Sequence, residues 1–269
     1  MEFGFGSLWI IQVCDSALGR VEANNNAITE VRIEGLTTPQ MIAVGEAAVW
    51  ISDHRRKAIF KIDPNTYSLI KMIRVPGLSP EGIMAVGEGS LWVLIAGPVV
   101  DALARVNVQS GRVEATIPLP SEISSVVVAN GSVWATGYAR NELYRIEPLT
   151  NTVTSITKLH DIPRALIPGE GSIWVLNEGD SSVQRIDATN GQLVATIRTG
   201  LRPGAGSIAI GGSYVWVSTP GSSITQIDPK TNTLVRSFIG GPGMGGPLRY
   251  GAGSLWIAGG RISRLQAPD

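Results

Sequence analysis

Short apolar runs alternate with polar turns along the chain, and the same pattern returns after roughly forty residues. Within one period, an apolar run such as residues 41–44 leads through a tight turn to a second run that contains a tryptophan. A third run ends in a basic, an apolar and an acidic residue, as at 61–63, and a more polar fourth run such as 193–198 follows. Runs of this length bounded by Gly, Asp, Asn and Pro predict four short strands per period. No stretch keeps helical spacing over more than two turns, so no long helix is expected.

The seven tryptophans mark the period. They are Trp9, Trp50, Trp92, Trp134, Trp174, Trp216 and Trp256, so consecutive tryptophans lie 40 to 42 residues apart. A period of this length built from short strands is typical of β-propellers. We therefore predict an all-β fold, a seven-bladed β-propeller of four-stranded antiparallel blades in a single domain over residues 1–269. We expect each tryptophan to pack between blades, where a large flat side chain fills the space between two sheets.

The ends of the sequence predict an incomplete terminal blade. Residues 2–6 offer a short first strand for blade 1, and after a third strand at 261–266 too few residues remain for a fourth strand in blade 7. Three explanations stay open at this point: one blade has three strands, the chain is a fragment of a longer gene product, or a neighbouring molecule adds the missing strand. The last explanation predicts self-association through an edge strand.

Composition and charge narrow the classes of function. The 22 basic and 22 acidic side chains balance, so the chain lacks the basic surface that nucleic-acid binding requires, and we expect no nucleic-acid partner. No apolar run approaches the roughly 20 residues of a membrane span, so no membrane insertion is expected. Cys14 is the only cysteine, which excludes an intramolecular disulfide. No signal peptide is visible; the localisation stays unknown, and a periplasmic or secreted protein processed from a longer precursor is compatible with the sequence.

The repeated motif combines Gly-x-Gly-Ser-Leu-Trp-Val, as at 87–93, with Arg-Ile-Asp at 185–187 and an Asp-Pro-x-Thr-Asn turn at 228–232. This motif resembles that of the YVTN-type and virginiamycin B lyase-like β-propellers over nearly the whole chain. The resemblance implies the propeller architecture, on which enzymes, binding proteins and scaffolds all occur. It also implies, for the lyase branch, a metal-assisted enzyme that opens a cyclic depsipeptide with paired histidines and a glutamate. Here only His54 and His160 are present, without any Glu-x-His pair.

In a four-stranded blade, the loops after the second and fourth strands share one end, and the tight turns occupy the other. The first set is longer and more varied here, so we expect the ligand there, around the mouth of a central channel. The candidate ligand-binding residues after the tryptophan strands are His54, Arg55, Tyr138, Arg140, Asn177 and Glu178. The candidates between blades are Gln40, Glu81, Glu122, His160, Asp161, Arg164 and Arg202. Gln40, Glu81 and Arg164 each follow a proline and are predicted to open first strands, where unlike residues at an equivalent position would distinguish the blades.

Two functions fit these residues. The first is a noncatalytic binding or scaffold propeller that holds a small molecule, a glycan or a protein on the long-loop face, because no convergent catalytic set is visible and the catalytic residues stay unknown. The alternative is a metal-assisted lyase or hydrolase. Its candidate ligands at the channel mouth are Glu81, Glu122, His160, Asp161 and Glu178, since oxygen-rich sites suit divalent cations. The cofactor is unknown, and a divalent metal is expected only under this alternative. His160 beside Asp161 would then present an oriented imidazole as a general base.

Overall fold

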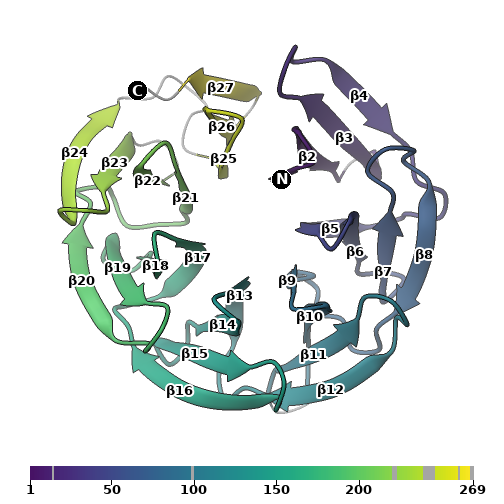
Figure 1. Ribbon diagram of the computed structural model, residues 1–269, viewed down its shortest axis with the longest axis horizontal. Helices are drawn as coiled ribbons and strands as arrows, with labels where there is room; N and C mark the ends of the chain where they lie inside the picture. Colours follow the sequence, from purple (N-terminus) through teal and green to yellow (C-terminus); the bar gives the residue numbers. More distant parts are fainter. Residues whose placement is uncertain (14, 98–99, 220–222, 239–245, 260, 267–269) are drawn as a thin grey trace. The chain divides into compact units, whose positions relative to one another are not determined.

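The structure is a computed structural model that describes residues 1–13, 15–97, 100–219, 223–238, 246–259 and 261–266. Within these residues the chain forms seven antiparallel sheets and contains no helix. Six sheets have four strands and the last has three, which confirms the predicted seven-bladed β-propeller with an incomplete terminal blade. The strands of each blade lie side by side in sequence order, as the consecutive strands β17 to β20 show in Figure 1.

The chain comprises two compact units, of which the first is Met1–Val128 with Pro148–Thr152. Blade 1 consists of β1 (Glu2–Gly4), β2 (Ser7–Gln12), β3 (Ala17–Glu22) and β4 (Ile28–Val31). Blade 2 consists of β5 (Pro39–Gly45), β6 (Ala48–Asp53), β7 (Ala58–Ile62) and β8 (Leu69–Arg74). Blade 3 consists of β9 (Met84–Gly87), β10 (Ser90–Ile95), β11 (Ala102–Asn107) and β12 (Val113–Pro118).

The second unit is Ala129–Glu147 with Val153–Asp269. Blade 4 consists of β13 (Ile123–Ala129), which except for Ala129 belongs to the first unit, and of β14 (Ser132–Gly137), β15 (Glu142–Glu147) and β16 (Thr152–Lys158). Blade 5 consists of β17 (Pro163–Gly169), β18 (Ser172–Asn177), β19 (Ser182–Asp187) and β20 (Leu193–Arg198). Blade 6 consists of β21 (Ser207–Gly211), β22 (Tyr214–Ser218), β23 (Ile224–Asp228) and β24 (Thr233–Phe238). Blade 7 consists of β25 (Leu248–Gly251), β26 (Ser254–Ala258) and β27 (Ile262–Gln266).

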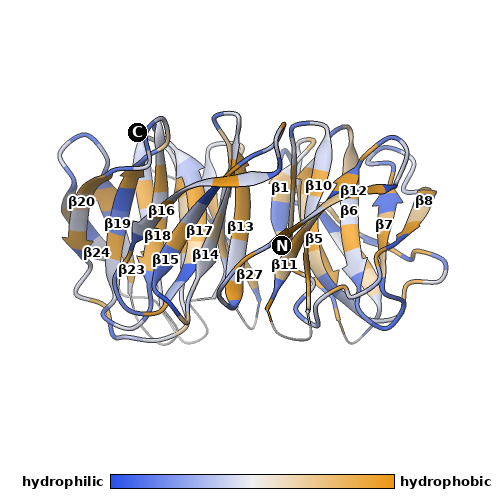
Figure 2. Ribbon diagram, turned by 90° about the horizontal axis from the view of Figure 1, so that it is seen from below, coloured by the Kyte–Doolittle hydropathy of each residue, from blue (hydrophilic) through white to orange (hydrophobic). Residues whose placement is uncertain are grey.

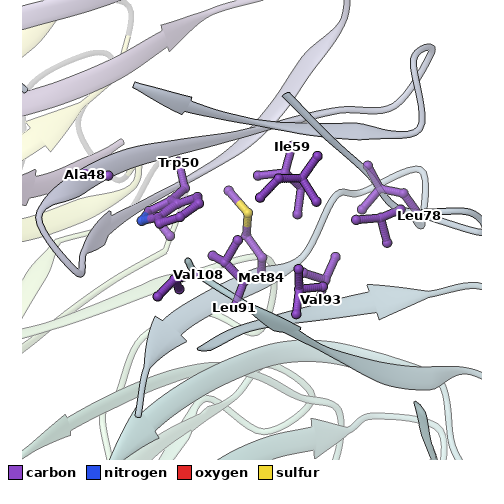
Figure 3. Packing of buried hydrophobic residues seen from close by; sticks show 12 residues of the cluster. Ala48, Trp50, Ile59, Leu78, Met84, Leu91, Val93 and Val108 are labelled. Carbon is purple, nitrogen blue, oxygen red and sulfur yellow. The ribbon is translucent and has the colours of Figure 1, made fainter. Parts of the chain in front are cut away.

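All seven tryptophans are buried, and Trp9, Trp50, Trp174 and Trp216 belong to core clusters shared with the next blade, as predicted. In the first unit, Trp50 packs with Leu91 and Val93 of β10 and with Met84 of β9, and Figure 3 shows this cluster at close range. All seven indoles are at most 1% exposed. Each indole Nε1 also donates a hydrogen bond to the carbonyl oxygen five residues earlier, for example from Trp50 to Gly45 at 2.9 Å. The indole therefore fills the core without leaving its polar atom unpaired.

A basic side chain joins one blade to the turn of the next. In blade 5, Arg185 pairs across the sheet with Trp174, and its guanidinium carbon lies 5.0 Å from the indole centroid. Arg185 Nε donates to Ser172 Oγ at 2.8 Å, and Nη1 donates to the carbonyl of Pro229 and to Asn232 Oδ1 in the blade 6 turn. We call this arrangement the arginine clamp. Basic residues stand over the tryptophan in the same way at Arg20, Lys61, Arg105, Arg145 and Arg264.

The turns confirm the roles predicted for aspartate and glycine. Gly171 has a φ of 66° in the turn between β17 and β18, which favours a residue without a Cβ. In the turn after β19, Asp187 Oδ1 accepts hydrogen bonds from the backbone N–H groups of Asn190 and Thr189 at 3.0 and 2.7 Å. These bonds hold the pKa of Asp187 below its ordinary value, since they favour the ionised carboxylate. Figure 2 shows hydrophobic residues, in orange, concentrated on the strands and hydrophilic residues, in blue, in many loops.

Blade 7 ends on an exposed third strand. In blade 5 the third strand, β19, is mostly buried, but the residues of β27 alternate between exposed and half-buried. The reason is that, within the described part of the chain, no fourth strand pairs with β27. An edge of this kind can accept another strand, so edge-strand self-association stays a prediction.

Candidate functional site

Seven of the predicted ligand-binding residues come from the loop end of blades 4 and 5, in the second unit. They lie on or next to three loops: 138–141 after β14, 159–162 before β17, and 178–181 after β18. The loops after the second and fourth strands share one end of a blade, so these segments meet. Six of the seven and one neighbouring residue form what we call the blade 4–5 surface: Tyr138, Arg140, Asn141, His160, Asp161, Arg164 and Glu178.

Arg164 has the central place on this surface. It follows Pro163 at the start of β17, as predicted, and its side chain is 47% exposed. Its guanidinium carbon lies 4.6 Å from the centroid of the Tyr138 ring, and its Nε is 3.5 Å from Glu178 Oε2. The aromatic face and the carboxylate fix the plane of the guanidinium without burying it. Two candidates from one blade and one from the preceding blade are thereby brought together.

Glu178 is 11% exposed and ties two further segments to the surface. Its Oε1 accepts a hydrogen bond from the Gly206 backbone N–H at 2.9 Å, and its own N–H donates to the Ile162 carbonyl at 2.8 Å. The carboxylate therefore stands between Arg164 and the loop that leads to β21. Because both of its oxygens are held, Glu178 is oriented before any ligand arrives.

Asn141 and Asp161 join the loops of blades 4 and 5. Asn141 Nδ2 donates to Asp161 Oδ1 at 3.3 Å, while Asn141 Oδ1 accepts the Ile162 backbone N–H at 3.1 Å. The Asp161 carbonyl accepts the Gly179 N–H at 3.0 Å. The loops approach so closely that a Cβ on Gly179 would stand 2.6 Å from Asp161 Oδ2, so only glycine fits there. The sequence context of Gly179 is that of an ordinary turn, but Gly179 and Asn141 set the spacing between these loops.

His160 is oriented by Asp180 rather than by its neighbour Asp161. Its Nδ1 lies 2.8 Å from Asp180 Oδ2, so Nδ1 carries a proton, and in the neutral ring Nε2 is then the acceptor. Burial alone would raise the pKa of Asp180, but hydrogen bonds from Ser182 and His160 lower it below its ordinary value. The predicted pairing of His160 with Asp161 is therefore wrong. The loop after β18 brings Asp180, and not Asp161, to the imidazole nitrogen.

Histidine, aspartate and serine meet here without the geometry of a catalytic triad. Ser182 Oγ donates to Asp180 Oδ1 at 2.6 Å and lies 3.4 Å from His160 Nδ1, the same ring nitrogen that Asp180 binds. In a triad, the serine and the carboxylate contact opposite ring nitrogens, so that the ring can take the serine proton. Ser182 is also 1% exposed. The arrangement positions an imidazole; it does not activate a nucleophile.

Asn177 supports the surface from beneath. It is fully buried, and its Nδ2 donates to Ser182 Oγ and to Gln184 Oε1, both at 3.0 Å. The same Gln184 oxygen accepts the His160 backbone N–H at 2.7 Å. The structure therefore places this predicted ligand-binding residue in the interior, where it holds the His160 loop in position.

Arg140 and Arg202 complete the candidates of the second unit. Both are exposed, and Arg140 lies close enough to Glu142 to help lower the pKa of that carboxyl. Burial alone would raise the pKa of Glu142, but hydrogen bonds from Lys158 and Tyr144, each 2.5 Å long, outweigh it. Arg202 lies in the loop before β21.

In the first unit, the candidate His54 directly follows an aspartate that framework contacts hold in place. Asp53 is buried, and its carboxylate accepts hydrogen bonds from the backbone N–H groups of Thr37, Thr38 and Arg56. Burial alone would raise the pKa of Asp53, but these bonds lower it. His54 Nδ1 lies 3.1 Å from Lys57 Nζ.

The remaining candidates of the first unit are exposed. They are Arg55, which follows His54, and the three residues between blades, Gln40, Glu81 and Glu122. Gln40 opens its strand as predicted, and Glu122 directly precedes β13. Glu81 does not open a first strand, because a turn at residues 79–82 comes before β9 begins at Met84. That turn is closed by a hydrogen bond from the Gly82 N–H to the Ser79 carbonyl, and Gly82 has a φ of 63°.

Sequence reasoning missed Glu142 and Ser182 and did not connect Asp180 with His160, although one signal was available. The third strand begins with alanine in blades 1, 2 and 3, but with Glu142 in blade 4 and Ser182 in blade 5. A polar residue at a position where three other blades have alanine indicates a departure from the framework of those blades. Asp180 carries no such signal, because an aspartate in a loop is ordinary turn chemistry.

The metal ligands proposed under the alternative function are not gathered together. Among the residues that the structure describes, no group of three or more His, Cys, Asp or Glu side chains could hold a metal ion. The described part of the chain also contains no helix long and apolar enough to cross a membrane.

Comparisons with known proteins identify the fold. Neither a protein-family model nor a curated protein matches the sequence. Solved structures match closely in shape: a streptogramin B lyase has a TM-score of 0.83 at 16% identity, covering 98% of this chain and 91% of that one. A catalytically inactive virginiamycin B lyase from Staphylococcus aureus with quinupristin has a TM-score of 0.82 at 15% identity, covering 100% and 94%. The resemblance to virginiamycin B lyase-like propellers is thus confirmed at the level of the fold.

The same fold occurs in a protein with unrelated chemistry. Hydrazine synthase from Kuenenia stuttgartiensis has a TM-score of 0.80 at 14% identity, covering 97% of this chain and 92% of that one. Identities this low establish architecture alone. The function must therefore be argued from the residues of this chain.

Proposed function

We propose that the chain is a noncatalytic binding propeller that holds a small-molecule, glycan or protein ligand on the blade 4–5 surface. The observation that carries the proposal is the set of contacts among the three loops. Arg164, Glu178, Asn141 and Asp161 come from separate loops or strand ends and are joined by ion-pair and hydrogen-bond contacts, while several of their polar atoms still face solvent. A polar surface that is ordered before binding loses little conformational entropy when a ligand binds, which favours affinity.

The same contacts argue against a chemical step at this surface. His160 and Ser182 contact through the ring nitrogen that Asp180 already occupies, so the serine has no base. The described residues also offer no three-ligand metal cluster. The alternative, a metal-assisted lyase or hydrolase, is therefore kept as an outcome of the test.

A glycan array probed with the labelled chain tests the proposal, with parallel incubations in EDTA and in Mg²⁺. We expect selective retention in both conditions, loss of retention in Asn141→Ala, and retention unchanged in Arg198→Gln, a substitution on the exposed fourth strand of blade 5. Mass spectrometry of the retained glycans should show unaltered masses. A glycan that is cleaved only in Mg²⁺ would establish the alternative, and retention that Asn141→Ala leaves intact would place the binding surface elsewhere.

A further inference from the structure

The guanidinium of Arg164 presents two unused donors in a fixed plane. Tyr138 lies against its face at 4.6 Å, and Glu178 holds the Nε edge at 3.5 Å. Neither Nη atom has a hydrogen-bond partner among the described residues, and the side chain is 47% exposed. The outer edge of the group therefore offers two N–H bonds to solvent. That arrangement matches the two oxygens of a carboxylate in a bidentate pair.

The groups around Arg164 suit hydroxyls. The exposed Asp161 carboxylate can accept hydrogen bonds, and in the neutral His160 ring Nε2 is an acceptor because Nδ1 donates to Asp180. Asn141 holds Asp161 through its amide, so this acceptor is oriented. A fixed cation beside oriented hydroxyl acceptors is complementary to a molecule that carries a carboxylate next to hydroxyl groups.

The charge of the surface disfavours a phosphate. Arg164 and Arg140 supply two positive charges, and Asp161, Glu178 and Asp180 supply three negative ones. The lowered pKa of Asp180 keeps its carboxyl ionised at neutral pH. A phosphate dianion concentrates two charges at one point and would meet like charge on several sides, whereas each unit of a uronate chain carries a single charge, and only one unit needs to reach the outer edge of Arg164.

We propose that the blade 4–5 surface binds the uronate unit of an acidic glycan, with Arg164 pairing its carboxylate and with Asp161 and His160 accepting from its hydroxyls. This inference rests on the proposed function and narrows it to one ligand class. Tyr138 and Glu178 act as positioning residues, since they set the plane of the guanidinium.

Isothermal titration with tri-galacturonate tests the inference, with the fully methyl-esterified trimer as a ligand of the same shape without charge. We expect binding of the acid and at least about tenfold weaker binding of the ester, because the ester keeps its carbonyl but loses the charge. Arg164→Gln copies the residue that blade 2 has at this position, Gln40, and should weaken binding of the acid by about tenfold or more. Arg164→Lys should weaken it to a similar degree, since a lysine cannot make the bidentate pair. Arg198→Gln is the matched control and should leave the affinity within about twofold.

The outcomes separate this inference from the proposed function. Equal affinity for the acid and the ester, or full affinity in Arg164→Lys, would overturn carboxylate recognition while leaving the surface as a binding site. If the chain does not bind tri-galacturonate but retains other glycans selectively on the array, carboxylate recognition is likewise overturned and the surface remains a binding site. Competition by inorganic phosphate at the affinity of the trimer would show a general anion site and refute the uronate assignment.

Discussion

Removal of the arginine clamp of blade 5 should destabilise the protein far more than removal of an exposed arginine in the same blade. Arg185→Met keeps the apolar stem and removes the donors to Ser172 Oγ, Asn232 Oδ1 and the Pro229 carbonyl. It also removes the cation 5.0 Å from the Trp174 ring. A hydrogen bond to a charged group contributes about 1.5–3 kcal/mol, and a cation–π contact about 0.5–2 kcal/mol. The contributions of the hydrogen bonds and the cation–π contact are not additive, and water takes over some of the lost hydrogen bonds. We therefore expect the free energy of unfolding to fall by about 3 kcal/mol.

Equilibrium unfolding in urea, followed by far-UV circular dichroism, measures this loss without relying on Trp174 fluorescence. Arg198→Met, on the exposed fourth strand, should change the free energy of unfolding by about 0.5 kcal/mol or less. Arg185→Lys should fall between the two, because Lys61 fills this role in blade 2 with Nζ 4.9 Å from the Trp50 ring and 3.2 Å from the Val108 carbonyl. If Arg185→Met and Arg198→Met unfold at the same urea concentration, the clamp contributes nothing and the reasoning fails.

Three further predictions concern the loops. Gly179→Ala should cost about 1–3 kcal/mol, because its Cβ meets the backbone of Asp161, and should abolish glycan retention on the array; thermal unfolding checks the first part. Asp53→Asn should destabilise the protein strongly at pH 7 and less at pH 3. The folded state lowers the pKa of Asp53, so the ionised carboxylate stabilises the fold above the ordinary pKa of 3.8, and this stabilisation is lost as the pH falls below that value. Melting temperatures of the wild type and the variant at both pH values test this. Asp180→Asn should release the His160 ring, so that nitrogen chemical shifts of the imidazole report a mixture of tautomers; an unchanged Nδ1–H tautomer would contradict the assignment.

The blades could be predicted from the sequence because each of their determinants is local and repeated. The tryptophan, the serine two residues before it, and the Asp-centred turn recur together, so each copy supports the interpretation of the others. The burial of Trp50 against blade 3 and the hydrogen bonds of Asp187 follow from that repeat. The start of β9 did not follow, since a turn closed by Gly82 overrides the proline signal before Glu81.

The blade 4–5 surface was predictable only in part. Tyr138, Arg164 and Glu178 attract attention as polar departures from a repeating framework, but nothing local says that they touch. Their contacts depend on how far each loop reaches toward the next blade, which is a property of tertiary structure. Asp180 shows the limit most clearly: its sequence context is that of a turn, yet it orients His160 from twenty residues away.

The arginine clamp makes each blade that carries it depend on a turn of the following blade. Ser172 and Arg185 belong to blade 5, but the carbonyl and amide that they secure belong to the turn of blade 6. Arg185 and Asn232 lie 47 residues apart, which is longer than one repeat of 40 to 42 residues, so no gene segment of a single repeat contains both halves of a clamp, wherever it is cut. Duplication or grafting of a blade in such chains should therefore succeed only where the new neighbour supplies the matching arginine or turn.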